Sequence, residues 1–378
     1  MIKLILIGLI LINKMILCSQ ATLATTEFVY PISYHNNLIY YIHQKSLEKI
    51  EFCSWDIKNQ TLKPDLLPNC LPGNLTLLPD SNGFSFIDRG KIRIKYFGLE
   101  KIKTINLSEP IYNISTINWV DNENFYFSAK NGSRFNIFFV NTCNENKLLT
   151  ISQQDINPKI NSDFLYPQVI NGKLFFIERS ADERYKTKKS HYKIIKINCP
   201  SCIKQEVKFL TEQDKEVLME FGNTPICFLK MINENEGIFI EHPALIEKTD
   251  RLIFFTLYKF YKQEVSNNWQ TKELTTFNLP IKYIFGKSDE RLYESILPFM
   301  PKIYNDKIYY SHSDNEEKLT IDLYSYNLKN KEIKKETASL NTEICFSSIR
   351  AGDKIYYGNK VTNPEFDKIN LQNFNFIV

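Results

Sequence analysis

Hydrophobic and polar side chains alternate along much of this chain with a period of two, which is typical of β-strands. Residues 91–96, KIRIKY, and residues 319–324, LTIDLY, show the alternation most clearly. Successive strand side chains point to opposite faces, so each segment predicts a strand with one inward and one solvated face. Helical patterns are few: TEQDKEVLMEF, residues 211–221, carries acidic residues early and predicts a short helix.

One longer pattern, NDKIYYSHSDNEEKLTIDLYSYNLKNKEI at residues 305–333, recurs along the chain. It begins with a turn of Asn, Asp or Gly, which tolerate the positive φ of tight hairpins, so the aromatic strand that follows is predicted as the second arm of a hairpin. The seven aromatic strands are IYYIH (39–43), FSFID (84–88), FYFSA (125–129), LFFIE (174–178), GIFIE (237–241), IYYSH (308–312) and IYYGN (355–359).

Other arms flank each aromatic strand and complete a unit of four strands. The upstream arms contain Pro31, Pro167 and Pro301, which suit an edge strand or a strand start because proline donates no ladder hydrogen bond. A repeat of roughly forty to seventy residues matches the blade of a β-propeller. A sandwich would use fewer strands, and a solenoid would have shorter repeats. We therefore predict an all-β chain folded as a seven-bladed β-propeller of four-stranded antiparallel blades. The outer strand of the final blade is expected from ATLATTEFV (21–29) or from FNFIV (374–378).

Composition agrees with this fold class. The 378 residues include 21 Tyr and 27 Phe but only 12 Gly, which favours strands with large half-buried side chains over a glycine-rich α/β fold. The net charge is only +4 and lysines alternate with acids, so no nucleic-acid partner is expected.

The first residues have the features of a cleavable leader. One Lys precedes an apolar run from Leu4 to Ile12, and the small residues Ser19 and Ala21 follow. We expect cleavage after Ala21 or after Ala24, giving a signal peptide at residues 1–21 and a single propeller domain at 22–378, with no transmembrane segment after cleavage. The expected location is extracytoplasmic, either periplasmic or secreted. A lipoprotein anchored at Cys18 is the alternative, although Leu17 is bulky for that processing enzyme.

The order of turn, aromatic strand, loop and LYSYNL-like strand resembles the TolB-like and WD-type propeller repeats of exported bacterial proteins. The resemblance covers roughly residues 27–378 as architecture. Asn-Gly or Asn-Asp stands here where TolB-type repeats have Ser-Pro-Asp-Gly.

Polar residues gather at the ends of the aromatic strands. Because equivalent strands of a propeller end on the same face, these residues are candidates for a binding rim around one mouth. The alternative is that a residue leaving a strand is polar simply because it meets water. The candidate rim residues are His43, Asp88, Glu178, Arg179, Glu241, His242 and His312, while Ala129 and Asn359 occupy the same position in the other two strands.

The cysteine and histidine patterns predict no catalytic or metal-binding site. Cys199 and Cys202 lie where a hairpin turn is expected, which favours a local disulfide or two free thiols over metal. With five histidines and no HExxH motif, neither a metal site nor a cofactor is predicted.

The sequence lacks GxSxG and sialidase-type motifs, so the preferred function is a non-enzymatic, monomeric scaffold that binds a protein or a glycan. The alternative is an enzyme acting on a glycan at the propeller mouth, with two of Asp88, Glu178 and Glu241 as acid and base. A lipid-anchored envelope scaffold is a third reading.

Overall fold

The protein is described by a computed structural model in which two compact units are distinguished, residues 73–297 as one and residues 1–72 with 298–378 as the other. In the part of the chain that the structure describes, no helix is long and apolar enough to cross a membrane. The described residues are 23–25, 28–44, 50–59, 61–68, 75–88, 91–97, 99, 101–107, 111–112, 114–115, 117–143, 148–153, 160–182, 190–198, 207–242, 252–280, 300–314, 321–336, 344–351, 354–360 and 374–377.

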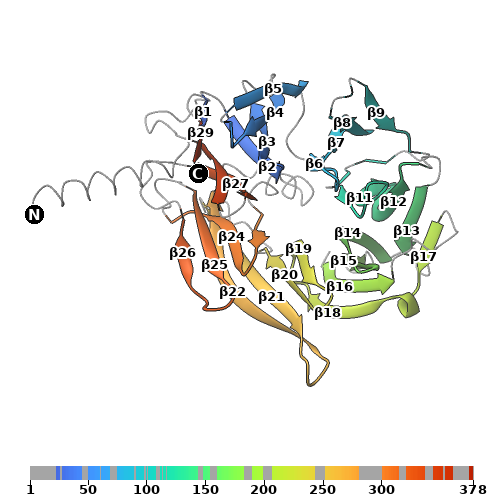
Figure 1. The fold of residues 1–378 in the computed structure, drawn as a ribbon. Coiled ribbons are helices and arrows are strands. Elements are labelled where there is room, and N and C mark those ends of the chain that lie inside the picture. The colour runs from blue at the N-terminus through green and yellow to red at the C-terminus, as the bar shows by residue number, and fades with distance from the viewer. Residues whose placement is uncertain are drawn as a thin grey trace, which may run out of the picture. The chain divides into compact units, whose positions relative to one another are not determined.

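The unit of residues 73–297 contains four sheets (Figure 1). The strands of each sheet follow one another in chain order, except that β17 joins the second sheet before β18 completes the third. The first sheet has β6 (Thr76–Leu77), β7 (Gly83–Asp88), β8 (Lys91–Tyr96) and β9 (Ile102–Ile105). The second has β10 (Asn118–Trp119), β11 (Asn124–Asn131), β12 (Arg134–Asn141), β13 (Leu148–Gln153) and β17 (Val207–Leu210). The third has β14 (Ile160–Ile170), β15 (Lys173–Asp182), β16 (Ser190–Asn198) and β18 (Glu216–Gly222), and the fourth has β19 (Ile226–Asn233), β20 (Glu236–Glu241), β21 (Leu252–Lys262) and β22 (Trp269–Pro280).

The other unit contains three sheets and both ends of the chain. One sheet has β2 (Phe28–His35), β3 (Leu38–Gln44), β4 (Ile50–Asp56) and β5 (Thr61–Pro68). A second has β23 (Lys302–Tyr304), β24 (Lys307–His312), β25 (Asp322–Asn327) and β26 (Ile333–Lys335), and the third has β1 (Leu23–Thr25), β29 (Phe374–Ile377), β28 (Lys354–Lys360) and β27 (Ile344–Ala351).

The aromatic strands occupy the place that the repeat predicted. Each forms the second arm of a hairpin: β3, β7, β11, β15, β20, β24 and β28. The turns explain this locally, because Asn36, Asn171 and Asn305 adopt positive φ, as does Gly172. In the turn before β7 the positive φ falls on Ser81 instead. Gly83 begins β7, and a Cβ there would lie 2.4 Å from the Lys95 backbone oxygen, so close backbone approach explains this glycine.

The prediction of seven four-stranded antiparallel blades is wrong. Six sheets in the described part of the chain have four strands and are antiparallel throughout, and these are the regular blades. The remaining sheet has five strands because β17 pairs in parallel with β13, with Thr150 opposite Val207 and Gln153 opposite Leu210. Figure 1 shows β17 beside β13. The chain then returns through β18 to complete the next sheet, where β18 pairs with β16.

The helix expected at residues 211–221 is also wrong. Only η3, a 3₁₀ turn at Glu212–Asp214, forms in this segment, and β18 begins two residues later at Glu216. The acidic residues Glu212 and Asp214 do lie in a first helical turn, but backbone pairing of β18 with β16 replaces the helical hydrogen bonds beyond Asp214.

The prolines lie where ladder bonding is weakest. Pro31 and Pro167 are in the edge strands β2 and β14, whose registers shift between Pro31 and Ser33 and between Leu165 and Gln168. Pro301 immediately precedes β23. The prediction of edge positions or strand starts is confirmed, because a bulge accommodates a residue that cannot donate.

Apolar cores fill the space between consecutive sheets of the 73–297 unit. Ile92 and Ile94 of β8 pack in one cluster with Phe125 and Phe127 of β11. A second cluster joins the β10–β13 sheet to the β14–β16 sheet through Ile137, Ile151, Phe164 and Phe176. A third joins that sheet to the next one through residues that include Phe175, Ile177, Leu229 and Phe239. Both faces of the central strands are therefore buried, which explains the continuous apolar runs of the aromatic strands.

Candidate functional site

The predicted rim residues fall in both units, and each unit is considered by itself. Glu178, Arg179, Glu241 and His242 belong to the 73–297 unit, and His312 belongs to the other. His43 and Asp88 lie at or next to the ends of β3 and β7, but their side chains are outside the described part of the structure, as are Cys199 and Cys202 entirely.

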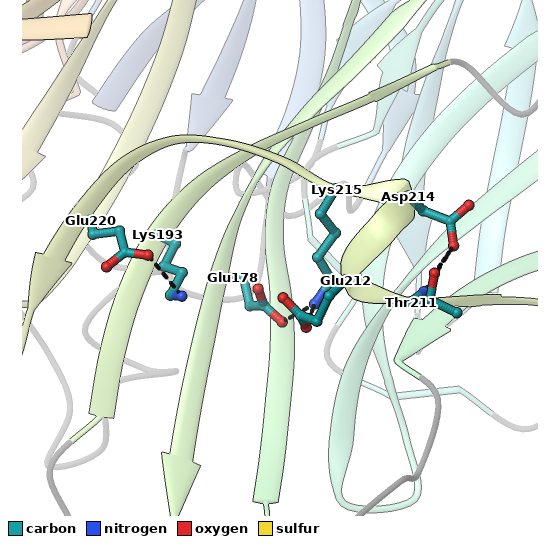
Figure 2. A network of polar contacts seen from close by, with 7 residues as sticks. All are labelled: Glu178, Lys193, Thr211, Glu212, Asp214, Lys215 and Glu220. Carbon is teal, nitrogen blue, oxygen red and sulfur yellow. Dashed lines mark hydrogen bonds and ion pairs between the residues drawn. The ribbon is translucent and has the colours of Figure 1, made fainter. Parts of the chain in front are cut away.

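Glu178 is buried rather than presented to solvent, and it is held by a lysine that the sequence did not single out. The Lys215 Nζ donates to Glu178 Oε1 at 2.7 Å and to Glu212 Oε1 at 3.1 Å. The side chains of Lys215 and Glu178 are only 1% and 7% exposed, whereas Glu212 is 73% exposed. Figure 2 shows the lysine pointing between the two carboxylates. Burial of a charge is tolerated when its partner satisfies it, as here.

The crossover between two sheets places Lys215 there. After β17 has paired with the preceding sheet, η3 turns the chain, and Lys215 lies between η3 and β18. A capping box fixes the turn: the Thr211 backbone N–H and hydroxyl both donate to Asp214 Oδ2 at 2.8 Å. These hydrogen bonds, with a further one from Lys208, lower the pKa of Asp214 to about 2.

A second pair in Figure 2 joins β16 to β18 at the solvent side. The Lys193 Nζ lies 2.9 Å from Glu220 Oε1, and this hydrogen bond raises the pKa of Lys193. Glu178 and Lys193 are register partners across β15 and β16. The network therefore follows the seam between the crossover and its sheet.

Arg179 and Glu241 are also engaged within their own sheets. The Arg179 guanidinium donates to Asp163 Oδ2 at 2.6 and 3.0 Å, and Asp163 Oδ1 accepts from the Phe135 backbone N–H. Burial, together with the neighbouring Glu241 to which it is hydrogen-bonded, raises the pKa of Tyr258 to about 12. The His242 ring packs on Phe255 with centroids 5.4 Å apart.

A second group of ionisable side chains surrounds His312 at the β24–β25 end of its sheet. The His312 Nε2 lies 3.1 Å from Asp314 Oδ1, and Asp314 Oδ2 accepts from the Tyr324 hydroxyl and from Lys335 Nζ, the latter at 3.1 Å. Lys335 also lies 2.5 Å from Asp322 Oδ2. Asp322 is opposite His312 in the β24–β25 ladder. We call these five residues the His312 cluster.

The electrostatics of the His312 cluster keep the imidazole neutral near pH 7. Burial lowers the pKa of His312 below its ordinary value, against the opposing influence of Asp314 and Asp322. Burial also disfavours ionised Asp314, but hydrogen bonds from Tyr324 and Lys335 outweigh it, so the pKa of that carboxyl is lowered. With two carboxylates, one ammonium and a neutral imidazole, the cluster carries one net negative charge.

Metal ligation is not supported by the part of the chain that the structure describes. No group of three or more His, Cys, Asp or Glu side chains there has a geometry that could hold an ion. In the His312 cluster, the Lys335 ammonium occupies the position between the two carboxylates where a cation would bind.

Sequence reasoning missed Lys215, Asp314, Asp322 and Lys335. The Thr-x-x-Asp spacing of Thr211 and Asp214 was a usable indication of a capped turn that ends near Lys215. Asp322 is on the polar side of the LTIDLY alternation, yet it is only 6% exposed, and Lys335 pairs with it. No local pattern indicates that pairing.

Comparisons with known proteins address the fold. No family model and no curated protein sequence matches the chain. Among solved structures, the β-propeller domain of the Trilobed protease from Pyrococcus furiosus has a TM-score of 0.54 at 11% identity, covering 93% of this chain and 96% of that one. The fold is that of a β-propeller. The resemblance to propeller repeat proteins is thus confirmed at the level of architecture.

Two further structures share the fold at similar distance. A puromycin-hydrolyzing peptidase of Mycobacterium tuberculosis has a TM-score of 0.56 at 8% identity, covering 88% of this chain, but this chain spans only about half (50%) of that peptidase. A polysaccharide lyase described as an ulvan lyase bound to a GlcA(1-4)Rha3S repeat has a TM-score of 0.50 at 8% identity and covers 95% of this chain and 96% of that one. At these identities the similarity concerns fold alone.

Proposed function

We propose that the protein is an exported, non-enzymatic β-propeller that presents strand ends and loops of one face to a protein or glycan partner. The observation that carries the proposal is that the ionisable rim residues with described side chains have protein partners. Glu178 is held by Lys215, and Arg179 is held by Asp163. Groups held in this way build a rigid surface, whereas a general acid or base needs access to a substrate proton.

The test asks whether the protein binds a ligand without altering it chemically. Purified protein is screened on a glycan array. In a separate experiment, partners in the envelope of the producing cell are chemically cross-linked to the protein and captured with it. We expect a saturable ligand that is recovered unaltered, and we expect His312→Ala to weaken its binding while Lys329→Ala, in an exposed pair with Asp306, does not. Recovery of a chemically altered ligand contradicts the scaffold.

A second candidate function is a glycan-acting enzyme, and one observation favours it. In the His312 cluster, Asp314 is placed to orient a neutral imidazole, an arrangement that serves as a general base in other enzymes. The polysaccharide lyase has a similar fold. In this candidate the general base is His312 and not Glu178, because the Glu178 carboxylate is paired with the buried Lys215 ammonium.

Its test uses acidic polysaccharides that contain uronate. A lyase leaves a new carbon–carbon double bond, which is detected by its ultraviolet absorbance, and His312→Ala is expected to abolish that signal. Absence of product from all acidic polysaccharides with the wild-type chain contradicts this candidate and leaves the scaffold.

A further inference from the structure

The first described strand of the chain is paired with the last. β1 runs antiparallel to β29, with Leu23 opposite Phe376, Ala24 opposite Asn375 and Thr25 opposite Phe374 (Figure 1). In the sheet order β1-β29-β28-β27, β1 is the outer strand and β29 becomes an edge without it. The two predicted sources of the outer strand, the N-terminal and the C-terminal segment, thus both join this sheet.

This pairing distinguishes between the two cleavage positions that the leader sequence allows, after Ala21 and after Ala24. Cleavage after Ala24 would remove Leu23 and Ala24 and leave only Thr25 of the three-residue strand. Cleavage after Ala21 would leave all of β1, with Thr22 as a single residue before it. The small side chains required at positions −3 and −1 of the cut are then supplied by Ser19 and Ala21.

We propose that a leader peptidase hydrolyses the bond between Ala21 and Thr22, and that the new end of the chain folds as the closing strand of the last sheet. Water supplies the atoms: the Ala21 carbonyl carbon becomes a carboxylate and the Thr22 nitrogen becomes a free amine. The inference rests on the export that forms part of the proposed function. It selects one of the two predicted cleavage positions and assigns a structural role to the processed end.

Loss of β1 would remove the three residue pairs that join it to β29 and would make β29 the outer strand of the sheet. Cleavage after Ala21 keeps all three pairs, whereas cleavage after Ala24 keeps only Thr25 opposite Phe374. Sheet pairing therefore favours the earlier position on physical grounds.

A lipid-anchored end at Cys18 has a different geometric consequence. Four residues, 19–22, would separate the lipidated cysteine from β1, and an extended chain of that length spans about 14 Å. The last sheet would then be held against the membrane surface. The mass of the mature end distinguishes this arrangement from a free Thr22.

The first experiment determines the mature end. The full chain with its own leader is produced in an exporting bacterial host, and the purified protein is analysed by intact mass and N-terminal sequencing. We expect Thr22 as the first residue. An end at Thr25 or a lipidated Cys18 overturns the inference but leaves export standing, whereas retention of Met1 removes the export on which both proposals depend.

Matched variants identify the residue that the peptidase reads. Ala21→Asp places a charge at the position that needs a small side chain, and we expect loss of the Thr22 end. Ala24→Asp is the control and is expected to leave that end unchanged. The reverse pattern contradicts the proposed cut.

The second experiment tests the closing strand independently of processing. Two mature chains are compared by hydrogen exchange, one beginning at Thr22 and one beginning at Thr26. We expect the β29 amides that bond to β1 to exchange at least about tenfold faster in the shorter chain, since they lose their partner strand, while the β29 amides that bond to β28 keep theirs. Equal exchange would falsify the role assigned to β1.

Discussion

At the scale of single residues, the clearest feature is a lysine and a glutamate buried together. Lys215 and Glu178 are nearly inaccessible, and the lysine comes from a crossover that belongs to two sheets. The Lys215 ammonium also lies 5.9 Å from the centre of the Phe164 ring, within the distance of a cation–π contact. Removing Lys215 would leave the Glu178 carboxylate buried without its cation.

We expect Lys215→Ala to reduce the free energy of unfolding by about 3–5 kcal/mol, because Glu178 would remain buried without its cation. Denaturant unfolding measures the change. Lys329→Ala is the control, since Lys329 and Asp306 are 76% and 52% exposed and such pairs contribute at most about 1 kcal/mol. The double variant Lys215→Met with Glu178→Leu should recover much of the loss. A small effect of Lys215→Ala would contradict the buried pair.

His312 gives a prediction about pH. Its pKa lies below the ordinary value of 6.5 in the folded chain, so the unfolded chain binds more protons as the pH falls below that value. The free energy of unfolding should therefore decrease as the pH falls from about 6.5 toward the folded pKa of His312, and His312→Gln should reduce this dependence. Imidazole NMR titration measures the pKa directly.

The same titration tests the role of Asp314. Because its carboxylate raises the pKa of His312, Asp314→Asn should move the midpoint of the His312 titration further down. An upward movement would show that the two side chains do not interact as described.

At the scale of elements, the crossover β17–η3–β18 departs from the repeat. β17 extends one sheet in parallel and β18 completes the next, so one connection holds two neighbouring sheets. Leu210 of β17 is buried in the core between those sheets, while Phe209 is 56% exposed. The capping box of Thr211 and Asp214 sets the direction of the chain between the two strands.

Acid should weaken this turn. The pKa of Asp214 is about 2 in the folded chain against an ordinary value of 3.8, so its contribution to stability is present above about pH 4 and is lost as the pH falls toward 2. Asp214→Asn should therefore lower stability at pH 7, by about 1 kcal/mol at most for a partly exposed group, and the difference from wild type should vanish near pH 2.

Urea unfolding across this pH range provides the measurement. Glu264→Gln, at an exposed position in the β21–β22 turn, serves as the charge-matched control and should show no such dependence. A pH-independent effect of Asp214→Asn would indicate that its carboxylate is not bound as described.

At the scale of the whole molecule, the chain forms two compact units, and the one that contains both ends is discontinuous in sequence. Its last sheet combines residues from near both ends of the chain. The other unit is continuous and has its own cores between consecutive sheets. Changes at the chain ends should therefore act mainly on the discontinuous unit.

A chain ending at residue 373 lacks β29 and tests this expectation. Hydrogen exchange should rise in peptides of β1, β27 and β28, because β29 pairs with β28 and β1. Exchange in β15 and β16, which lie in the other unit, should stay the same. A uniform rise in exchange across the chain would contradict two separately packed units.

The sequence by itself determined the elements, since they depend on local chemistry. Alternation, aromatic residues and Asn or Gly turns placed the seven aromatic strands, and the prolines indicated edge strands. The tertiary structure decided what depends on partners distant in the chain. β17 pairs with a neighbouring sheet, and β18 forms where the sequence predicted a helix. Glu178 and Asp322 are buried because Lys215 and Lys335 pair with them. A strand pattern specifies which backbone groups need partners, but only packing selects the partners and decides which charges can leave water.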